Sequence, residues 1–460
     1  MQSYRLKAAY LATGWSHDVV VSVSDEGLIT HIGADQSDLS SNVEKIDDIV
    51  VPGMPNAHSH AFQRAMAGDT EYRLSSHDSF WTWRQSMYAL AGKLEPDELK
   101  LIATQVYVEM LKAGYTSVAE FHYLHRMRDG SVYEENNELW QAIGAAAHEA
   151  GIGLTFLPTL YQTSDFGGAP LKPEQQRFRS ETDFFLRAVE SQLARERRAG
   201  ANTQRTGVAF HSLRAVPLDT LVRAAGALKA MDADMPLHVH IAEQQLEVEA
   251  CIRETGRRPI ELLLDTGLVD EHWCLVHATH AKPQEIKRIA TSGASVCVSI
   301  TTEANLGDGF FDTGRYLKNG GRLCVGSDSQ STVSPAEELR WLEYQQRLRK
   351  RRRGVLATRT ESHVGSVLWH EAAEAGARAL GQPIGKLAVG MRADWLVLDA
   401  AHPTLAGGAL ETVLDRLVFA GGDKAIRDVM VAGRWVVRTG RHALDDSLRD
   451  EFGSLVKRMN

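Results

Sequence analysis

The sequence has no apolar run close to the ~18 consecutive residues that cross a bilayer. Its first residues, MQSYRLKAAYLATGWSHD, lack the apolar core of a secretory signal peptide. A basic excess is also missing, because 51 lysines and arginines stand against 59 aspartates and glutamates, a formal net charge of −8. Nucleic-acid-binding proteins normally carry such an excess. We therefore expect a cytoplasmic protein with neither nucleic acid nor a membrane as its partner.

Cysteine is scarce, with 4 cysteines in 460 residues and no CxxC pair among them. Three lie in apolar segments that read as strands, where a free cysteine behaves as a small hydrophobic residue. This distribution argues against a disulfide framework and against a structural zinc knot. Hydrophobic residues make up 43% of the chain, enough to build a large core.

Apolar segments of strand length alternate with amphipathic segments of helix length. The strand-like segments are residues 49–58, 116–123, 152–161, 207–213, 236–243, 273–279, 295–300 and 322–328. One intervening segment predicts a helix that begins near Pro96 and ends at Gly114. Eight strands alternating with helices predict an α/β fold, a (β/α)8 TIM-like barrel. An open doubly wound sheet is disfavoured, because no Gly-rich phosphate-binding fingerprint follows the first strand.

The two ends of the chain differ from this central pattern. Residues 1–47 and 386–460 contain short runs in which apolar and polar positions alternate, with turn residues between them. Chain termini often lie close together in folded domains. We therefore expect both ends to form one small β-sandwich domain beside a barrel of residues 48–385.

Histidines and acidic residues recur where the predicted strands end. His58 and His60 lie two apart in extended backbone, so their side chains point the same way. Similar positions on later strands are taken by His240, Glu243, His277 and Asp328. Barrel enzymes place their active sites at this end of the strands, and imidazole with carboxylate is a donor set for zinc. The sequence therefore predicts a divalent metal centre.

Two arginines are predicted near the same end of the barrel. Arg84 lies in an aromatic stretch (SFWTWR) read as a loop after the first strand, and Arg214 follows the fourth strand. Burying a guanidinium is costly unless it meets an anion, and it pairs with a carboxylate through two parallel hydrogen bonds. Two such residues indicate a small dicarboxylate substrate.

The combination of these motifs, together with GKLAVGMRADWLVLD at 385–399, resembles the amidohydrolase superfamily in its deaminase-like, single-metal branch. The resemblance implies one zinc ion per subunit, held by His58, His60, His240 and Asp328. Binuclear members use a lysine from the fourth strand, and the corresponding segment here, VAFH, has none. Imidazole and carboxylate also suit Fe2+ or Mn2+, so the metal itself stays open.

The expected chemistry follows from these groups. Zinc lowers the pKa of a bound water from ~15.7 towards ~7 and supplies a hydroxide at neutral pH. His277 is the expected base, Asp328 both binds the metal and accepts or orients the proton, and Glu243 protonates the departing nitrogen. These roles predict the hydrolytic loss of ammonia from a C=N carbon.

A narrower resemblance rests on NAHSHAFQRAMAG, SFWTWR, AEFHYLH, AFHSLRAV and HVHIAEQ, which are similar to the formimidoylglutamate deiminase family. That family hydrolyses N-formimidoyl-L-glutamate to N-formyl-L-glutamate and ammonia in histidine degradation, and the resemblance implies a homodimer. The positions that match its substrate contacts are Gln63, Arg84, Tyr123, His211 and Arg214.

Two other interpretations stay open at this point. A related single-metal amidohydrolase would deaminate a purine or pyrimidine ring, and its pocket would favour aromatic stacking and amide contacts over two arginines. A non-catalytic barrel scaffold would typically have lost one or more metal ligands, whereas the full set is present here.

Overall fold

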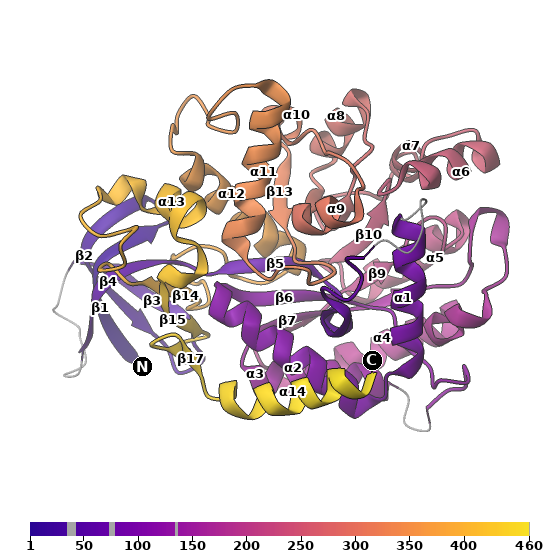
Figure 1. Ribbon diagram of the computed structural model, residues 1–460, viewed down its shortest axis with the longest axis horizontal. Helices are drawn as coiled ribbons and strands as arrows, with labels where there is room; N and C mark the ends of the chain where they lie inside the picture. Colours follow the sequence, from indigo (N-terminus) through magenta and orange to yellow (C-terminus); the bar gives the residue numbers. More distant parts are fainter. Residues whose placement is uncertain (35–42, 73–78, 134–136, 460) are drawn as a thin grey trace.

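The computed structural model describes residues 1–34, 43–72, 79–133 and 137–459. A sheet built from both ends of the chain lies beside a barrel wrapped by helices (Figure 1). Within the described ranges, no helix is both long and apolar enough to cross a membrane.

Eight parallel strands form the barrel, in the hydrogen-bonded order β13-β12-β11-β10-β9-β7-β6-β5. Their bounds are β5 (Met54–Ser59), β6 (Tyr115–His122), β7 (Gly153–Leu160), β9 (Val208–Phe210), β10 (Leu237–Ile241), β11 (Trp273–His277), β12 (Ser295–Val298) and β13 (Arg322–Val325). The short β8 (Gln204–Thr206) pairs with β7 off this path. An isolated parallel bridge between Ser59 and Asp328 joins the two ends of the order and closes the ring. The predicted (β/α)8 barrel is therefore confirmed.

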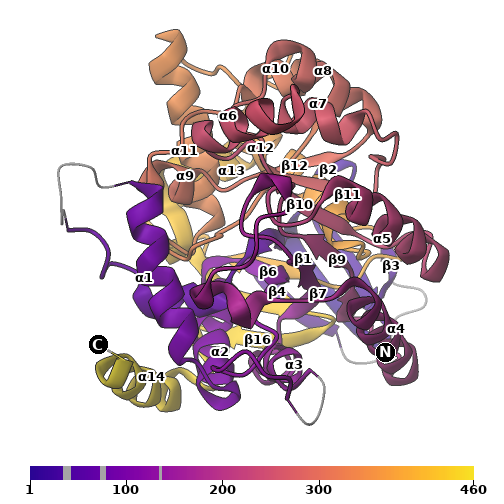
Figure 2. The ribbon, with the colours of Figure 1, turned by 90° about the vertical axis from the view of Figure 1, so that its right-hand side faces the viewer.

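Helices surround the strands when the molecule is viewed from the side in Figure 2. Their bounds are α1 (Phe80–Lys93), α2 (Pro96–Ala113), α3 (Glu138–Ala150), α4 (Thr182–Ala199), α5 (Leu218–Met231), α6 (Gln245–Thr255), α7 (Pro259–Leu264), α8 (Pro283–Ser292), α9 (Ile300–Leu306), α10 (Thr313–Lys318), α11 (Pro335–Lys350), α12 (Val364–Leu380), α13 (Val413–Arg416) and α14 (Asp445–Met459). Helix α2 confirms the predicted segment: Glu95 caps its start and Gly114, with a φ of 106°, ends it.

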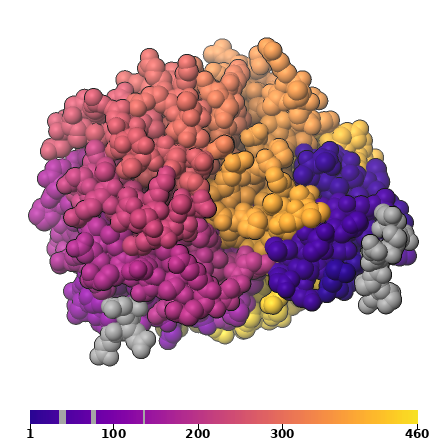
Figure 3. All heavy atoms as spheres, turned by 180° about the vertical axis from the view of Figure 1, so that it is seen from behind, coloured from indigo at the N-terminus to yellow at the C-terminus, as the bar shows by residue number. Residues whose placement is uncertain are grey.

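The second sheet has the order β17-β16-β15-β14-β4-β1-β2-β3. Its strands are β1 (Gln2–Leu11), β2 (Gly14–Val23), β3 (Ile29–Gly33), β4 (Val43–Pro52), β14 (Trp395–Leu398), β15 (Ile426–Val431), β16 (Arg434–Arg438) and β17 (Arg441–His442). Strand β4 joins the two halves, parallel to β1 and antiparallel to β14. Figure 3 shows the N-terminal part gathered at one end of the molecule. A β unit from both termini is thus confirmed, while its limits at 1–47 and 386–460 stay a prediction.

Two predicted strands differ from the observed ones. The segment 49–58 is not one strand, because β4 ends at Pro52 in the terminal sheet and β5 begins at Met54 in the barrel. Gly53 separates them, and a Cβ there would lie 2.2 Å from Cγ2 of Thr116. The segment 207–213 contributes only the three residues of β9. In both cases the strand ends where its hydrogen bonds to neighbouring strands end, and not where the apolar run of the sequence ends.

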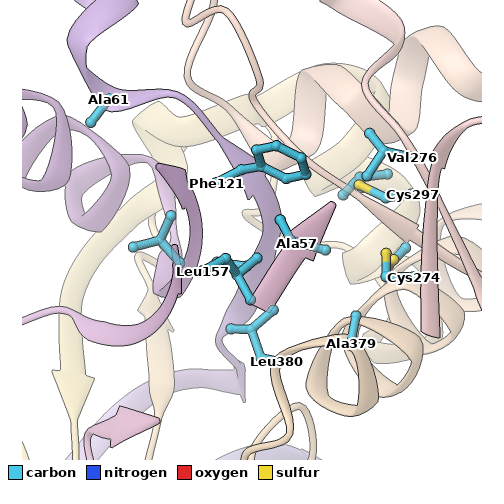
Figure 4. Packing of buried hydrophobic residues seen from close by; sticks show 14 of the residues in the cluster. Ala57, Ala61, Phe121, Leu157, Cys274, Val276, Cys297, Ala379 and Leu380 are labelled. Atoms are coloured by element: carbon cyan, nitrogen blue, oxygen red, sulfur yellow. The ribbon is translucent and has the colours of Figure 1, made fainter. Parts of the chain in front are cut away.

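The barrel core is made of small and branched side chains with a few aromatic rings. Figure 4 shows Phe121 above Ala57 and Leu157, with Cys274 and Cys297 beside Val276. All four cysteines are free and buried. Cys274, Cys297 and Cys324 lie in β11, β12 and β13 and act as small hydrophobic residues, as the sequence predicted.

Candidate metal and active site

The carboxyl ends of β5, β10, β11 and β13 bring imidazoles and a carboxylate together. His58 Nε2 lies 3.0 Å from His240 Nε2 and 3.4 Å from Asp328 Oδ1. His60 Nε2 lies 3.5 Å from the same carboxylate oxygen. All four side chains are buried. The strand-end positions predicted from the sequence therefore converge on one point, as parallel strands of a barrel require.

Main-chain carbonyls orient two of these rings. Nδ1 of His60 donates to the carbonyl of Phe121 at 2.8 Å, and Nδ1 of His240 donates to the carbonyl of His211 at 2.9 Å. With the proton on Nδ1, the lone pair of each Nε2 faces the cluster. Metal-binding histidines are normally held in this way by a hydrogen bond from the other ring nitrogen.

Burial also prepares the ionisation states that a metal ion needs. It lowers the pKa of His58 to about 3 and lowers those of His60 and His240, so the imidazoles are neutral at pH 7. Burial alone would raise the pKa of Asp328, but the neighbouring imidazoles hold it below its usual range. Neutral imidazole and ionised carboxylate are the forms that bind a metal.

The spacing of these atoms fits one divalent ion. Two ligand atoms that each lie about 2.1 Å from zinc are at most about 4.2 Å apart. The three distances given above, for His58–His240, His58–Asp328 and His60–Asp328, satisfy this limit. His58, His60 and Asp328 form one possible ligand group, and His58, His240 and His277 form a second. His58, His60, His240 and Asp328 are the candidate ligands, and His277 lies beside them.

His277 lies among three carboxylates. Its Nε2 is 3.8 Å from Glu243 Oε1 and 3.7 Å from Asp328 Oδ2, and its Nδ1 is 3.1 Å from Glu303 Oε1. Burial lowers the pKa of His277, but these carboxylates outweigh it and raise the pKa to about 10. Burial raises the pKa of Glu243 to about 7. A proton can therefore be held on this pair near neutral pH.

The sequence analysis missed Glu303 and Asp308. Glu303 is buried in α9, where its carboxylate also accepts from the main-chain N–H of Ser299 at 3.1 Å. Asp308 follows that helix and accepts from Nε2 of Gln244, and burial together with Glu243 raises its pKa to about 9. The signal for Glu303 was an acidic residue three positions after the apolar segment SVCVSI.

The two arginines are buried at the same mouth of the barrel. Arg84 Nη2 donates to the hydroxyl of Tyr161 at 3.2 Å, and its guanidinium lies 5.0 Å from the centre of the Tyr88 ring. Arg214 donates to the carbonyl of Ser164 at 3.5 Å, and the nearby charges of Glu247 and Glu243 favour its protonated form without an ion pair. Each is 8% exposed, and neither forms an ion pair with any carboxylate in the described part of the chain.

The expectation that Arg84 lies in a loop was wrong. It lies in α1, which begins after Ser79, and the side chains of Ser79 and Thr82 form a capping box at its start. The stretch FWTWR is poor in strong helix formers, so the cap and tertiary packing determine the helix. The helical position holds the guanidinium against Tyr88, one turn further along.

Aromatic and amide groups connect the arginines to the metal ligands. Gln63 Nε2 donates to the hydroxyl of Tyr123 at 3.0 Å. The ring of His211 lies 5.6 Å from that of Tyr123, 4.5 Å from that of Tyr161 and 5.1 Å from that of His240. The five predicted substrate contacts therefore line one region beside the metal ligands.

Strained backbone is concentrated at this site. Residues other than glycine take positive φ at the ends of two strands: His277 has φ 69° at the end of β11, and Asp328 and Gln330 have φ 46° and 62° after β13. Such conformations cost about 1–3 kcal/mol each and persist where surrounding contacts impose them. Here they turn side chains toward the barrel axis just as the strands end.

Similarity to known proteins covers almost the whole chain. Residues 49–436 match the amidohydrolase family. Formimidoylglutamate deiminase of Pseudomonas aeruginosa is 49% identical over 96% of each chain. 8-Oxoguanine deaminase of the same bacterium is 27% identical over 94% of this chain and 92% of its own length. The crystal structure of an amidohydrolase from Brucella melitensis matches over the full length of both chains, with a TM-score of 0.92 and 39% identity.

Proposed function

The chain belongs to the amidohydrolase family, and we propose that it hydrolyses N-formimidoyl-L-glutamate to N-formyl-L-glutamate and ammonia in histidine degradation. It is a hydrolase that acts on C–N bonds. The proposed substrate is the one in the name of the Pseudomonas aeruginosa relative, with which this chain is 49% identical. The sites for the two ends of that substrate support the proposal independently.

The polarity of the site matches the two ends of this molecule. The formimidoyl group is an amidine, which carries a positive charge when protonated, and the glutamate end carries two carboxylates. Glu243, Glu303 and Asp328 surround His277 on the metal side. Arg84 and Arg214 supply buried positive charge for the two carboxylates. Complementary charge of this kind orients a dipolar ligand as well as attracting it.

The proposed metal ligands are His58, His60, His240 and Asp328, with zinc as the proposed ion, and three of them form one group of possible ligands in the structure. When bound, zinc lowers the pKa of a coordinated water towards ~7 and so supplies a hydroxide at neutral pH. His277 would take the proton of the attacking water at Nε2 once the charge of a bound divalent cation offsets the carboxylates that raise its pKa in the metal-free chain. The carboxylate of Glu303 would stabilise the resulting imidazolium at Nδ1.

Glu243 is placed to complete the reaction. Its Oε1 lies 3.8 Å from His277 Nε2, and its pKa of about 7 allows it to hold a proton at neutral pH. It delivers this proton to the departing nitrogen and takes back the proton of the attacking hydroxyl as the C=O bond forms, so that the C–N bond breaks with release of ammonia and not of an amide anion. A positioned acid of this kind contributes typically ~10²–10⁴-fold.

One observation carries the choice of substrate class. Arg84 and Arg214 are both buried, yet neither has a carboxylate partner within ion-pair distance among the described residues. Buried guanidinium groups are normally paired. A dicarboxylate substrate supplies the missing anions, whereas a purine or pyrimidine ring does not.

A substrate panel tests the proposal. Ammonia release is measured with N-formimidoyl-L-glutamate, N-formimidoyl-L-aspartate, 8-oxoguanine and adenosine, before and after chelation and after zinc is restored. We expect release from formimidoylglutamate alone at a high rate, its loss on chelation and its return with zinc. A zinc-loaded protein that turns over only a ring would replace this proposal by ring deamination, and one inactive on every compound would favour a scaffold.

We further propose that the protein is a homodimer in the cytoplasm, with residues 1–47 and 386–460 as one domain and 48–385 as the other. The resemblance of the sequence to its family supports the dimer. Light scattering decides this directly, because a chain of 50.8 kDa would double its mass. Limited proteolysis between the two units tests the division into domains.

A further inference from the structure

The barrel closes through the two segments that carry three of the four proposed ligands. The main-chain N–H of Asp328 donates to the carbonyl of His58 at 3.0 Å, and that of His60 donates to the carbonyl of Asp328 at 3.1 Å. Gly326 permits this approach, because a Cβ there would lie 2.7 Å from Cβ of His58. The seam between β13 and β5 is therefore narrow and continues directly into the site.

A row of buried, hydrogen-bonded side chains spans this seam. Gln330 Oε1 accepts from Ser327 Oγ at 2.8 Å, while its Nε2 donates to Ser59 Oγ at 3.0 Å and to the carbonyl of Asp328 at 2.8 Å. Gln330, Ser327 and Ser59 are fully buried. The amide of Gln330 thus contacts Ser59, which lies between His58 and His60. It also contacts Ser327 and Asp328, which begin the turn after β13.

Two further hydrogen bonds extend this network of side chains at its two ends. Asn56 Nδ2 donates to Ser327 Oγ at 2.7 Å, and Ser59 Oγ donates to Glu120 Oε2 at 2.7 Å. Each serine hydroxyl therefore accepts one hydrogen bond and donates one. Fully satisfied buried networks rigidify the segments that they join, whereas a broken one leaves costly unpaired groups.

We propose that Gln330 is a positioning residue that fixes the spacing between the His58–His60 segment and Asp328, and thereby sets the affinity for the metal. This inference rests on the proposed metal ligands and not on the identity of the substrate. Gln330 reaches both segments, yet its side chain lies outside the proposed set of ligands. Without its three hydrogen bonds, the Asp328 turn is held to β5 by main-chain contacts and by the side chain of Asn56, which bonds Ser327.

The test compares two buried glutamines. Gln330→Leu removes the side-chain bonds across the seam. Gln382→Leu is the matched control, because Gln382 is also buried and bonds Thr155 Oγ1 at 2.8 Å and Arg392 Nη1 at 2.6 Å, away from the ligands. Zinc affinity is measured by chelator competition on the whole chain, with the melting temperature of the metal-free protein alongside.

We expect Gln330→Leu to weaken zinc binding about 10- to 100-fold, the usual effect of losing an outer-shell partner. Gln382→Leu should lower the melting temperature and leave zinc affinity within threefold. The proposal is overturned if Gln330→Leu binds zinc as the unsubstituted chain does, or if both variants weaken it equally. If Gln330→Leu does not fold, Ser59→Ala removes the bonds to Gln330 and to Glu120 and must weaken zinc binding by itself.

The outcome is separable from that of the proposed function. Zinc binding is read without substrate, so a chain that binds zinc but releases no ammonia from formimidoylglutamate leaves the inference on Gln330 intact. An unsubstituted chain that binds no zinc overturns it together with the metal site.

Discussion

Glu303 Oε1 lies 3.1 Å from Nδ1 of His277, although 26 residues separate the two in the sequence. The contact fixes the proton on Nδ1 and leaves Nε2 facing Glu243 and Asp328. This arrangement supports the proposed role of His277, because catalytic histidines are often oriented through their second nitrogen by a carboxylate. Two predictions follow from this arrangement, one for each residue.

Replacing Glu303 with glutamine should lower turnover about 10- to 100-fold while zinc stays bound, because the amide no longer stabilises the imidazolium. Steady-state ammonia release and metal content measure the two effects. Glu338→Gln is the control, since Glu338 is equally buried and bonds the backbone of Thr301 without touching His277. Equal losses in both variants would show that Glu303 acts through stability alone.

Replacing His277 with asparagine should abolish measurable turnover and leave the zinc content near one per chain. The base is removed, while His58, His60, His240 and Asp328 remain as ligands. Metal analysis of the purified variant decides the assignment. Loss of zinc would instead make His277 a ligand, in the alternative group that it forms with His58 and His240.

Replacing Arg84 or Arg214 with methionine should raise KM for formimidoylglutamate about 10- to 100-fold, since a hydrogen bond to a charged group contributes about 1.5–3 kcal/mol. The value of kcat should change much less. Initial rates over a range of substrate concentration separate the two constants. Arg349→Met, on the exposed face of α11, is the control. An unchanged KM in both site variants would contradict the proposal that these two arginines bind a dicarboxylate substrate.

Much of the site was predictable, because it follows a rule of position. In a parallel barrel the residues at the carboxyl ends of strands meet, so His58, His60, His240, His277 and Asp328 could be placed together without knowing the fold in detail. Helix α2 was predictable for a similar reason, since its cap, apolar face and terminal glycine are all local features.

The missed residues depend on contacts that no local pattern encodes. Gln330 meets Ser59 across 271 positions of the sequence. Glu120 lies within the apolar strand β6, where a carboxylate is explained only by its bonds to Ser59 and to the N–H of Ala61. The error at Arg84 has a related origin, because tertiary packing overrides the weak helix propensity of its stretch.

A last prediction concerns stability. Asp423 accepts from Ser334 Oγ at 2.6 Å, and burial raises its pKa to about 6. In the unfolded chain the same carboxyl titrates near ~3.9. The folded protein therefore holds a proton that the unfolded chain releases between these values, and the free energy of unfolding falls as pH rises from ~4 to ~6.

Asp423→Asn removes the cost of the buried charge and keeps an oxygen that accepts from Ser334. It should raise the free energy of unfolding by about 1–2 kcal/mol above pH 6, after allowance for the partial exposure of the residue. Near pH 4 the variant and the unsubstituted chain should unfold alike. Denaturant titrations at pH 4, 6 and 8 measure the difference, with Asp450→Asn as an exposed control. A stabilisation that is the same at all three values would mean that packing, and not ionisation, is its source.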